Sequence, residues 1–501
     1  MPSHLRCLVT GATGYIGGRL VPELLEAGFT VRCMARDPGK LADRPWSGDV
    51  EVAKADVTDP AALRTALDGC DVAYYLIHSL GTGGSFEQKD ADAARAFADA
   101  AREAGVGRIV YLGGMISGQE GDLSPHLRSR AQVGDILLDS GVPTAALQAA
   151  VIIGSGSASF EMLRYLTERL PAMITPKWVD TKIQPIAVQD VLRYLVGAAT
   201  LPADVNRRFD IGGPDVLTYA EMMRRYAAVT HLTPRLLVPV PLLTPSLSSH
   251  WIGLVTPVPP GLARPLIESL RIEVVASEHD IAQYVPDPPG GLLPLDRAIE
   301  LAVAHTQEGD VSTSWSSAGT PGAPSDPLPS DPDWAGGSLY VDERTSVVNA
   351  APDALWRVIE GIGGTTGWYS FAGAWAVRGL ADRLVGGVGL RRGRRDPVHL
   401  RPGDALDFWR VEAMKPGELL RLRAEMKLPG VAWLELHVGT DDDGRTVYRQ
   451  RAIFQPRGLT GHAYWRSSSL LHGLVFGDML RNITTAAEQA GTHTPIEKRA
   501  S

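Results

Sequence analysis

Short apolar runs rich in β-branched residues alternate with helix-length segments in the first part of the chain. This alternation is typical of successive βαβ units and predicts an α/β fold with a doubly wound parallel sheet. The predicted strands are Cys7 to Thr10, Val31 to Ala35, Val50 to Lys54, Val72 to Leu76, Arg108 to Leu112 and Thr144 to Ala149. The predicted helices are Ile16 to Ala27, Ala61 to Leu67, Phe86 to Ala104 and Ala131 to Ser140.

The pattern changes after Val151, and we interpret residues 152–307 as the remaining strands and a substrate-side subdomain. A stretch rich in Ser, Pro, Gly and Asp follows and is typical of a linker. Beyond it, the pattern predicts short strands, a helix opening at Pro352 and a long closing helix from Ser469 to Gln489. The predicted division is a domain at 1–310, a linker at 311–337, a domain at 338–492 and a flexible tail at 493–501.

The first predicted strand ends in a glycine-rich loop, which reads Thr-Gly-Ala-Thr-Gly-Tyr-Ile-Gly from Thr10 to Gly17. A dinucleotide pyrophosphate needs close backbone approach, N–H donors and the positive end of a helix dipole. A strand before the loop and a helix after it make this a Rossmann-type phosphate loop. The residues expected to hold the cofactor here are Gly11, Thr13, Gly14, Tyr15 and Ile16.

The end of the second strand decides between the two nicotinamide cofactors. NAD-selective folds place an acidic residue there, against the ribose 2′-hydroxyl, whereas this chain carries Arg36. A guanidinium suits a 2′-phosphate, so the sequence favours NADP(H) over NAD(H). Arg32 is a second candidate cation, and the adjacent Asp37 is the alternative that would face a free ribose.

Composition narrows the class of protein. With 44% hydrophobic residues, 21% charged residues and a formal charge of -8, the chain gives no reason to expect nucleic acid or anionic membrane as a partner. Three cysteines suit packing thiols in a reducing cytosol, and no Cys or His spacing indicates a metal site. Four prolines interrupt the most apolar stretch, Leu236 to Val258, which favours a pocket-capping segment over a membrane-spanning helix.

These residues resemble those of extended and atypical short-chain dehydrogenase/reductases, including NmrA-like NAD(P)-binding proteins. The resemblance covers about the first 300 residues. It implies that an acidic residue after the third strand contacts the adenine, here Asp56 with Val57, and that the end of the fourth strand, Leu76 to His78, runs along the cofactor. Because Met1 is followed almost directly by the first strand, we expect no export signal, and together with the packing thiols this predicts a cytoplasmic protein.

The second half resembles bacterial domains of unknown function of the START-like type, also called SRPBCC or polyketide-cyclase-like. The matching stretches are Asp333 to Gly337, Gly363 to Tyr369, Tyr464-Trp465 and His472-Gly473. The resemblance implies an α+β helix-grip fold with an apolar ligand under the long helix.

Typical short-chain dehydrogenases carry a Tyr-x-x-x-Lys pair on a helix with a serine before it, and this chain lacks the pair. The corresponding segment places His126 at the tyrosine position and Arg130 at the lysine position, with Ser117 as the nearest serine. If the segment is helical, the four-residue spacing puts both side chains on one face. His126 would then donate a proton and Arg130 would hold the nicotinamide ribose; the alternative for His126 is a polar cleft-lining role.

The sequence therefore predicts an oxidoreductase that transfers hydride, with NADP(H), to or from a carbonyl, enone or similar apolar molecule. Two alternatives stay open: a sensor or assembly protein that binds NADP(H) without turnover, and a lipid or isoprenoid-binding module. The oligomeric state is not predicted.

Overall fold

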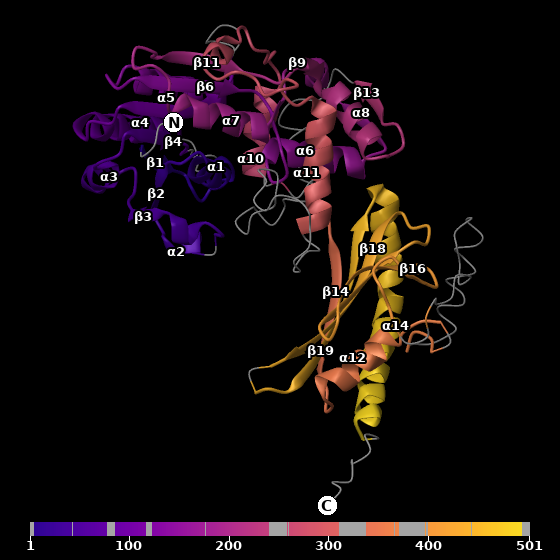
Figure 1. Cartoon of the computed structure of the whole chain (residues 1–501). Helices are drawn as coiled ribbons and strands as arrows, with labels where there is room; N and C mark the ends of the chain where they lie inside the picture. Colours follow the sequence, from indigo (N-terminus) through magenta and orange to yellow (C-terminus); the bar gives the residue numbers. More distant parts are fainter. Residues whose placement is uncertain are drawn as a thin grey trace, which may run out of the picture. The chain divides into compact units, whose positions relative to one another are not determined.

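The computed structural model describes residues 5–42, 44–77, 86–116, 123–175, 177–239, 258, 260–309, 337–364, 366–369, 396, 399–441 and 443–492. The chain divides into two compact units, residues 1–337 and 338–501, each taken here by itself (Figure 1). The predicted linker, apart from Gly337, and the predicted tail lie outside the described residues. Their limits therefore stay predictions.

The first unit carries a seven-stranded parallel sheet with the order β11-β6-β5-β4-β1-β2-β3. Its strands are β1 (Arg6–Thr10), β2 (Thr30–Ala35), β3 (Glu51–Lys54), β4 (Val72–Tyr75), β5 (Arg108–Gly114), β6 (Thr144–Ala149) and β11 (Arg207–Ile211). The first six are the predicted strands. Because β1 lies between β2 and β4, the strand order reverses there, and ligands of such sheets bind at the carboxyl ends of the strands at this point.

Helices cover both faces of this sheet (Figure 1). One face buries α1 (Tyr15–Glu26) and α7 (Val188–Ala198), and the other buries α3 (Pro60–Leu67), α4 (Phe86–Glu103) and α5 (Pro125–Leu138). The helix predicted from Ala131 begins earlier, because Ser124 caps it by accepting a hydrogen bond from the Leu127 N–H (3.2 Å), with proline in the first turn. His126 and Arg130 therefore lie on a helix.

A second hydrophobic core lies beside the sheet, in the predicted substrate-side part of this unit. Its helices are α6 (Ala158–Arg169), α8 (Tyr219–Val229), α10 (Pro260–Ser269) and α11 (Leu295–Gly309). Three two-stranded pairs border them: β7 (Ile152–Ile153) with β10 (Ile186–Ala187), β9 (Lys182–Ile183) with β12 (Leu217–Thr218), and β8 (Ala172–Thr175) with β13 (Leu236–Pro239). Apart from β13 and Val258, the predicted capping segment lies outside the described residues.

Short helical turns complete the described part of this unit: α2 (Gly39–Ala42), η1 (Ser47–Asp49), η3 (Lys177–Asp180) and η4 (Asp280–Gln283). Within the ranges that the structure describes, no helix is both long enough and apolar enough to cross a membrane.

The second unit is an antiparallel sheet with helices, in the order β14-β19-β18-β17-β16-β15. Its elements are β14 (Tyr340–Val347), α12 (Pro352–Glu360), β15 (Ala405–Leu406), β16 (Trp409–Lys415), β17 (Leu419–Ala424), β18 (Gly430–Thr440), β19 (Thr446–Pro456) and α14 (Gly458–Thr492). Figure 1 shows α14 running along the sheet, where it packs on β14, β19 and α12. Alternate residues of β18, such as Leu434 and Leu436, are buried in the core shared with α14.

The closing helix begins at Gly458 rather than at the predicted Ser469. Its added turns are held by stacking: the Trp465 ring lies 5.2 Å from the Tyr340 ring and 5.7 Å from the Phe454 ring, almost parallel to both. A contact between segments this distant in sequence outweighs the weak local helix signal of the added turns.

Replacing Gly473 in α14 by alanine is expected to stabilise the second unit by about 0.5–1 kcal/mol, because an alanine restricts the unfolded chain and favours the helix. A Cβ added at Gly473 meets nothing within 4 Å. The matched change Gly461→Ala in the same helix should destabilise the unit, since its Cβ would lie 2.4 Å from the Pro429 carbonyl oxygen. Denaturant unfolding of the full chain checks both, and shifts of the same sign would contradict the expectation.

Candidate functional site: a nucleotide loop and an apolar pocket

The glycine loop is built so that only glycine fits at its closest contacts. Gly11 has a φ of +70°, and a Cβ added there would lie 2.7 Å from the Leu76 carbonyl oxygen at the end of β4. A Cβ at Gly17 would lie 2.3 Å from the Gly11 carbonyl oxygen. Gly14 caps α1 without a side chain, and the first turn of α1 carries no acidic residue. The cradle therefore fits a pyrophosphate on the helix amino end.

Thr10 joins the two strands between which the order reverses. Its buried hydroxyl donates to the Tyr74 carbonyl oxygen (2.8 Å) and accepts from the Leu76 N–H (3.1 Å). The bridge sets the separation of β1 and β4 at the glycine loop. This role was not predicted, although a threonine that ends a buried strand directly before the loop could have indicated it.

The ends of β2 and β3 carry the residues expected at the adenosine half of the cofactor. Arg36 directly follows β2 and is exposed, while Asp37 Oδ1 accepts from the Gly39 N–H (3.1 Å) in its own turn. Asp56 Oδ1 accepts from the N–H (2.9 Å) and hydroxyl (2.7 Å) of Thr58. These hydrogen bonds, with a smaller effect from the charge of Arg36, lower the pKa of the Asp56 carboxyl.

Arg32, the second candidate cation, is engaged elsewhere. Its guanidinium pairs with Glu51 (2.9 Å) and donates to the carbonyl oxygens of Ala66 and Asp68 (2.8 Å each). These contacts hold the Arg32 guanidinium to β3 and to the end of α3. Its assistance to Arg36 at a 2′-phosphate stays a prediction.

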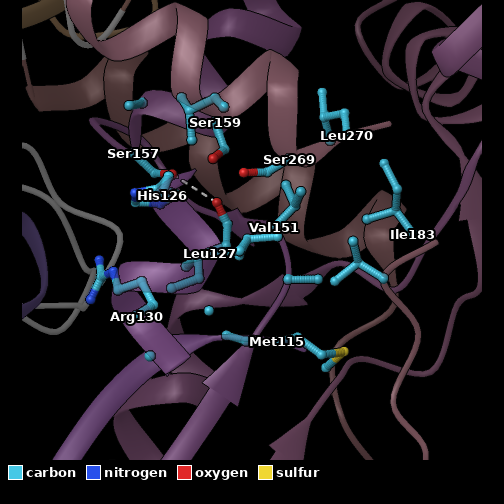
Figure 2. A pocket seen from close by; sticks show the side chains of 18 of the residues that line it. Met115, His126, Leu127, Arg130, Val151, Ser157, Ser159, Ile183, Ser269 and Leu270 are labelled. Carbon is cyan, nitrogen blue, oxygen red and sulfur yellow. Dashed lines mark hydrogen bonds between the residues drawn. The ribbon is translucent and has the colours of Figure 1, made fainter. Parts of the chain in front are cut away.

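A cavity of about 300 Å³ opens beside the glycine loop, and Figure 2 shows part of its lining. Tyr15, Ile16 and Leu76 form part of its lining, so the cavity is continuous with the place expected for the nicotinamide half of the cofactor. Most of the remaining wall is apolar, with Met115, Val151, Met162, Ile183, Leu266 and Leu270 among its residues. Its size lies at the lower end of small-molecule sites.

His126 and Arg130 lie on the wall of this cavity (Figure 2). His126 is the second residue of α5 and is 9% exposed. Arg130 follows one turn later, where its Nη1 donates to the Leu112 carbonyl oxygen (3.0 Å) and its own carbonyl oxygen accepts from the Tyr111 hydroxyl (3.1 Å). The end of β5 thus holds Arg130 in place while the helix holds His126.

The structure brings together only some of the candidate residues. Tyr15, Ile16, Leu76, His126 and Arg130 share one cavity. Arg36, Asp56 and Val57 follow β2 and β3 and do not line it, as expected for groups at the other half of a dinucleotide. Ser117 and His78 lie outside the described residues.

Contacts around Tyr15 form a second feature that the sequence analysis missed. The Arg19 guanidinium lies 4.1 Å from the centre of the Tyr15 ring and donates to the Ser155 carbonyl oxygen (3.2 Å). A Cβ added at Gly154 would lie 2.3 Å from the Tyr15 hydroxyl oxygen. Arg19 and Gly154 therefore join the start of α1 to the loop before α6, and the one sequence signal was a charged residue among the buried positions of α1.

Comparisons with known proteins agree with this arrangement. A family model described as NAD(P)H-binding matches residues 11–156, and one described as a protein of unknown function, DUF2867, matches residues 334–479. A ceramide reductase from Caulobacter vibrioides is 31% identical over 244 residues, which cover 46% of this chain and 72% of that protein. The mitochondrial mouse protein NADH dehydrogenase (ubiquinone) 1 alpha subcomplex subunit 9 is 27% identical over 277 residues. They cover 53% of this chain and 72% of that protein.

Among solved structures, Citrobacter sp. triphenylmethane reductase complexed with NADP(H) is 18% identical, with a TM-score of 0.47 over 60% of this chain and 100% of that one. The family rests on the sequence matches rather than on this likeness. The chain therefore belongs to the NAD(P)H-binding reductase family of the NmrA-like, atypical short-chain dehydrogenase type, and it carries a DUF2867 domain in its second half.

Proposed function

We propose that this protein is an NADP(H)-dependent oxidoreductase that transfers hydride to or from a carbonyl, enone or similar apolar small molecule. The observation that carries the proposal is the cavity whose lining includes the loop residues Tyr15 and Ile16, the polar pair His126 and Arg130, and an apolar wall. This lining supports the proposal because an apolar substrate bound there would lie next to the proposed cofactor site and proton donor.

In this proposal the cofactor lies across the carboxyl ends of β1, β2 and β4. Gly11, Thr13, Gly14, Tyr15 and Ile16 hold its pyrophosphate region, and Arg36 pairs with the 2′-phosphate. Asp56 and Val57 contact the adenine, while Leu76 and His78 run along the nicotinamide half. When bound, the cofactor supplies or accepts the hydride.

His126 is the proposed proton donor to the substrate oxygen, and Arg130 orients the nicotinamide ribose. The burial of His126 and the hydrogen bond from Arg130 to Leu112 support these roles, because both restrict side-chain motion near the reacting atoms. Ser117 stays the predicted counterpart of the serine that typical short-chain dehydrogenases carry before the Tyr-x-x-x-Lys pair.

For the second unit we propose the START-like, helix-grip assignment, with an apolar ligand or the apolar part of the substrate as its occupant. The antiparallel sheet with α14 packed along it supports this assignment. The proposed domain limits remain 1–310 and 338–492. A cytoplasmic setting also belongs to the proposal, and the three free, buried cysteines support it.

The test combines binding and turnover on the same samples of the full chain. Calorimetry measures the affinity for NADPH and NADH, and NADPH oxidation is then followed against apolar ketones, enones and quinones. Tight NADPH binding with turnover is the expected result. Absence of NADPH binding would overturn the proposal.

A second candidate is an NADP(H)-binding sensor or assembly protein without turnover. The missing Tyr-x-x-x-Lys pair favours it, as does the similarity to a subunit of a mitochondrial NADH dehydrogenase. A third, a lipid or isoprenoid-binding module, predicts that solvent extraction of the purified protein yields an apolar ligand. Tight NADPH binding with no turnover across the panel would favour the sensor.

Replacing Arg36 by alanine is expected to weaken NADPH binding by about 10- to 100-fold and NADH binding by less than about twofold, because a charge-assisted contact to phosphate is lost. The control Arg64→Ala removes an equal charge from α3, where Arg64 pairs with Glu103 (3.1 Å), and should change neither affinity. Calorimetry with both cofactors checks the expectation. Equal losses for NADPH and NADH in Arg36→Ala would rule out the 2′-phosphate contact.

A further inference from the structure

Three serine hydroxyls lie on the pocket wall near His126, as Figure 2 shows. Ser157 and Ser159 come from the start of α6, and Ser269 comes from the end of α10. Figure 2 shows Ile183 and Leu270 to the right of these serines, Val151 just below Ser269 and Met115 at the bottom of the view. The pocket therefore has a polar side beside the proposed proton donor and an apolar side.

The hydrogen of the Ser157 hydroxyl is already committed. Ser157 Oγ donates to the Ile152 carbonyl oxygen at 2.8 Å, and the residue is 6% exposed. A hydroxyl has one hydrogen and two lone pairs. Ser157 therefore offers the pocket a hydrogen-bond acceptor and no donor.

The hydroxyl hydrogen of Ser269 also has an acceptor within the protein. Its Oγ donates to the Pro265 carbonyl oxygen (2.9 Å) and lies 3.0 Å from Ser124 Oγ, which accepts from the Leu127 N–H. Either hydroxyl can be the donor in the Ser124 contact, and in both cases the single Ser269 hydrogen has a partner, Pro265 or Ser124. A lone pair of Ser269 is left for the pocket, so we assign Ser269, like Ser157, as an acceptor.

Ser159 differs from its two neighbours. No hydrogen bond of its hydroxyl occurs among the residues that the structure describes, so it can donate as well as accept. A ligand that carries only acceptors, such as a simple ketone, could pair with Ser159 but would leave Ser157 and Ser269 unmatched. Buried acceptors without a donor cost binding energy.

We infer that the substrate is an amphiphile: a hydrocarbon body against the apolar wall, and, next to the carbonyl that is reduced, a hydroxyl or amide N–H that donates to Ser157 or Ser269. That the substrate carries a carbonyl rests on the proposed function. That it carries a neighbouring hydrogen-bond donor rests only on the hydrogen bonds of the serines. It ranks a ketone with such a neighbouring donor above the corresponding simple ketone.

The test uses three probes with the same tail: decanone, its α-hydroxy derivative and the α-methoxy ether of that derivative. Their affinities are measured by calorimetry with the full chain saturated with NADP⁺, so the readout does not need turnover. The hydroxy ketone should bind about tenfold more tightly than the methoxy ether, as one matched hydrogen bond in a buried site requires.

Variants then assign this preference to residues. Ser157→Ala and Ser269→Ala should each reduce the hydroxy-to-methoxy ratio, and the double variant should bring it to about one, while decanone affinity stays unchanged. Ser159→Ala is the matched control and should preserve the ratio, since hydroxyl and ether oxygens accept from Ser159 equally well.

Equal binding of the hydroxy and methoxy probes, or no binding of either, overturns the inference. A preference for the hydroxy probe that survives the double variant overturns it as well. A serine-dependent preference without NADPH oxidation supports the donor inference and contradicts the proposed reductase, so the two failures are distinguishable.

Discussion

Replacing His126 by phenylalanine is expected to lower the turnover number about 100- to 10,000-fold while NADPH affinity stays within about twofold, because general acid catalysis contributes on this scale. His126 lines the pocket rather than the glycine loop, so cofactor binding should not need it. Steady-state kinetics with a substrate identified in the ketone panel, together with NADPH calorimetry, measure both quantities.

The control variant is His126→Gln, whose amide donates hydrogen bonds but releases no proton in the accessible pH range. If His126 transfers the proton, both variants should be equally slow, and both should lose the pH dependence that the proton donor contributes to the wild-type rate. Turnover that survives in His126→Gln but not in His126→Phe would assign a polar, orienting role. Unaltered turnover in both would make His126 a cleft-lining residue.

Replacing Gly17 by alanine is expected to weaken NADPH binding at least about 100-fold. The new Cβ would lie 2.3 Å from the carbonyl oxygen and 2.7 Å from the carbonyl carbon of Gly11, and both are backbone atoms that cannot rotate away. Either the loop or α1 must shift, and both supply the N–H donors expected to hold the pyrophosphate.

Overpacking of this kind also costs about 1–3 kcal/mol of stability, so the thermal unfolding midpoint is measured with the affinity. Gly48→Ala is the matched control, because a Cβ there meets nothing within 4 Å. A folded Gly17→Ala protein that binds NADPH with wild-type affinity would contradict the dinucleotide cradle. Loss of binding in the control would show that the assay reports instability instead.

The local hydrophobic pattern of the sequence was sufficient to predict the parallel sheet. Its first six strands follow apolar runs, and Gly28, Gly105 and Gly141, which come after predicted helices in the sequence, all have positive φ, as glycines that end helices commonly do. The strand β11 and the paired strands of the second core were predicted only as remaining strands within residues 152–307, without bounds. Two of those pairs consist of strands of two residues each, which are too short to carry a period.

The candidate site was predicted only in part, because only some of its residues lie close together in the sequence. The glycine loop and the four-residue spacing of His126 and Arg130 are local, and both residues line the pocket. The serines, by contrast, come from α6 and α10. The loss of their donors depends on hydrogen bonds that no spacing rule reveals, such as the one that joins Ser124 to Ser269.

By itself, the sequence determined the Rossmann-type sheet, the phosphate loop and the position of Arg36 after β2, because short-range periodicity and glycine chemistry act within a few residues along the chain. Only the tertiary structure decided which side chains meet in the pocket, how Thr10 spaces β1 and β4, and how far α14 extends. Those features arise from packing and hydrogen bonding between distant segments, and their energies depend on neighbours that a linear pattern does not name.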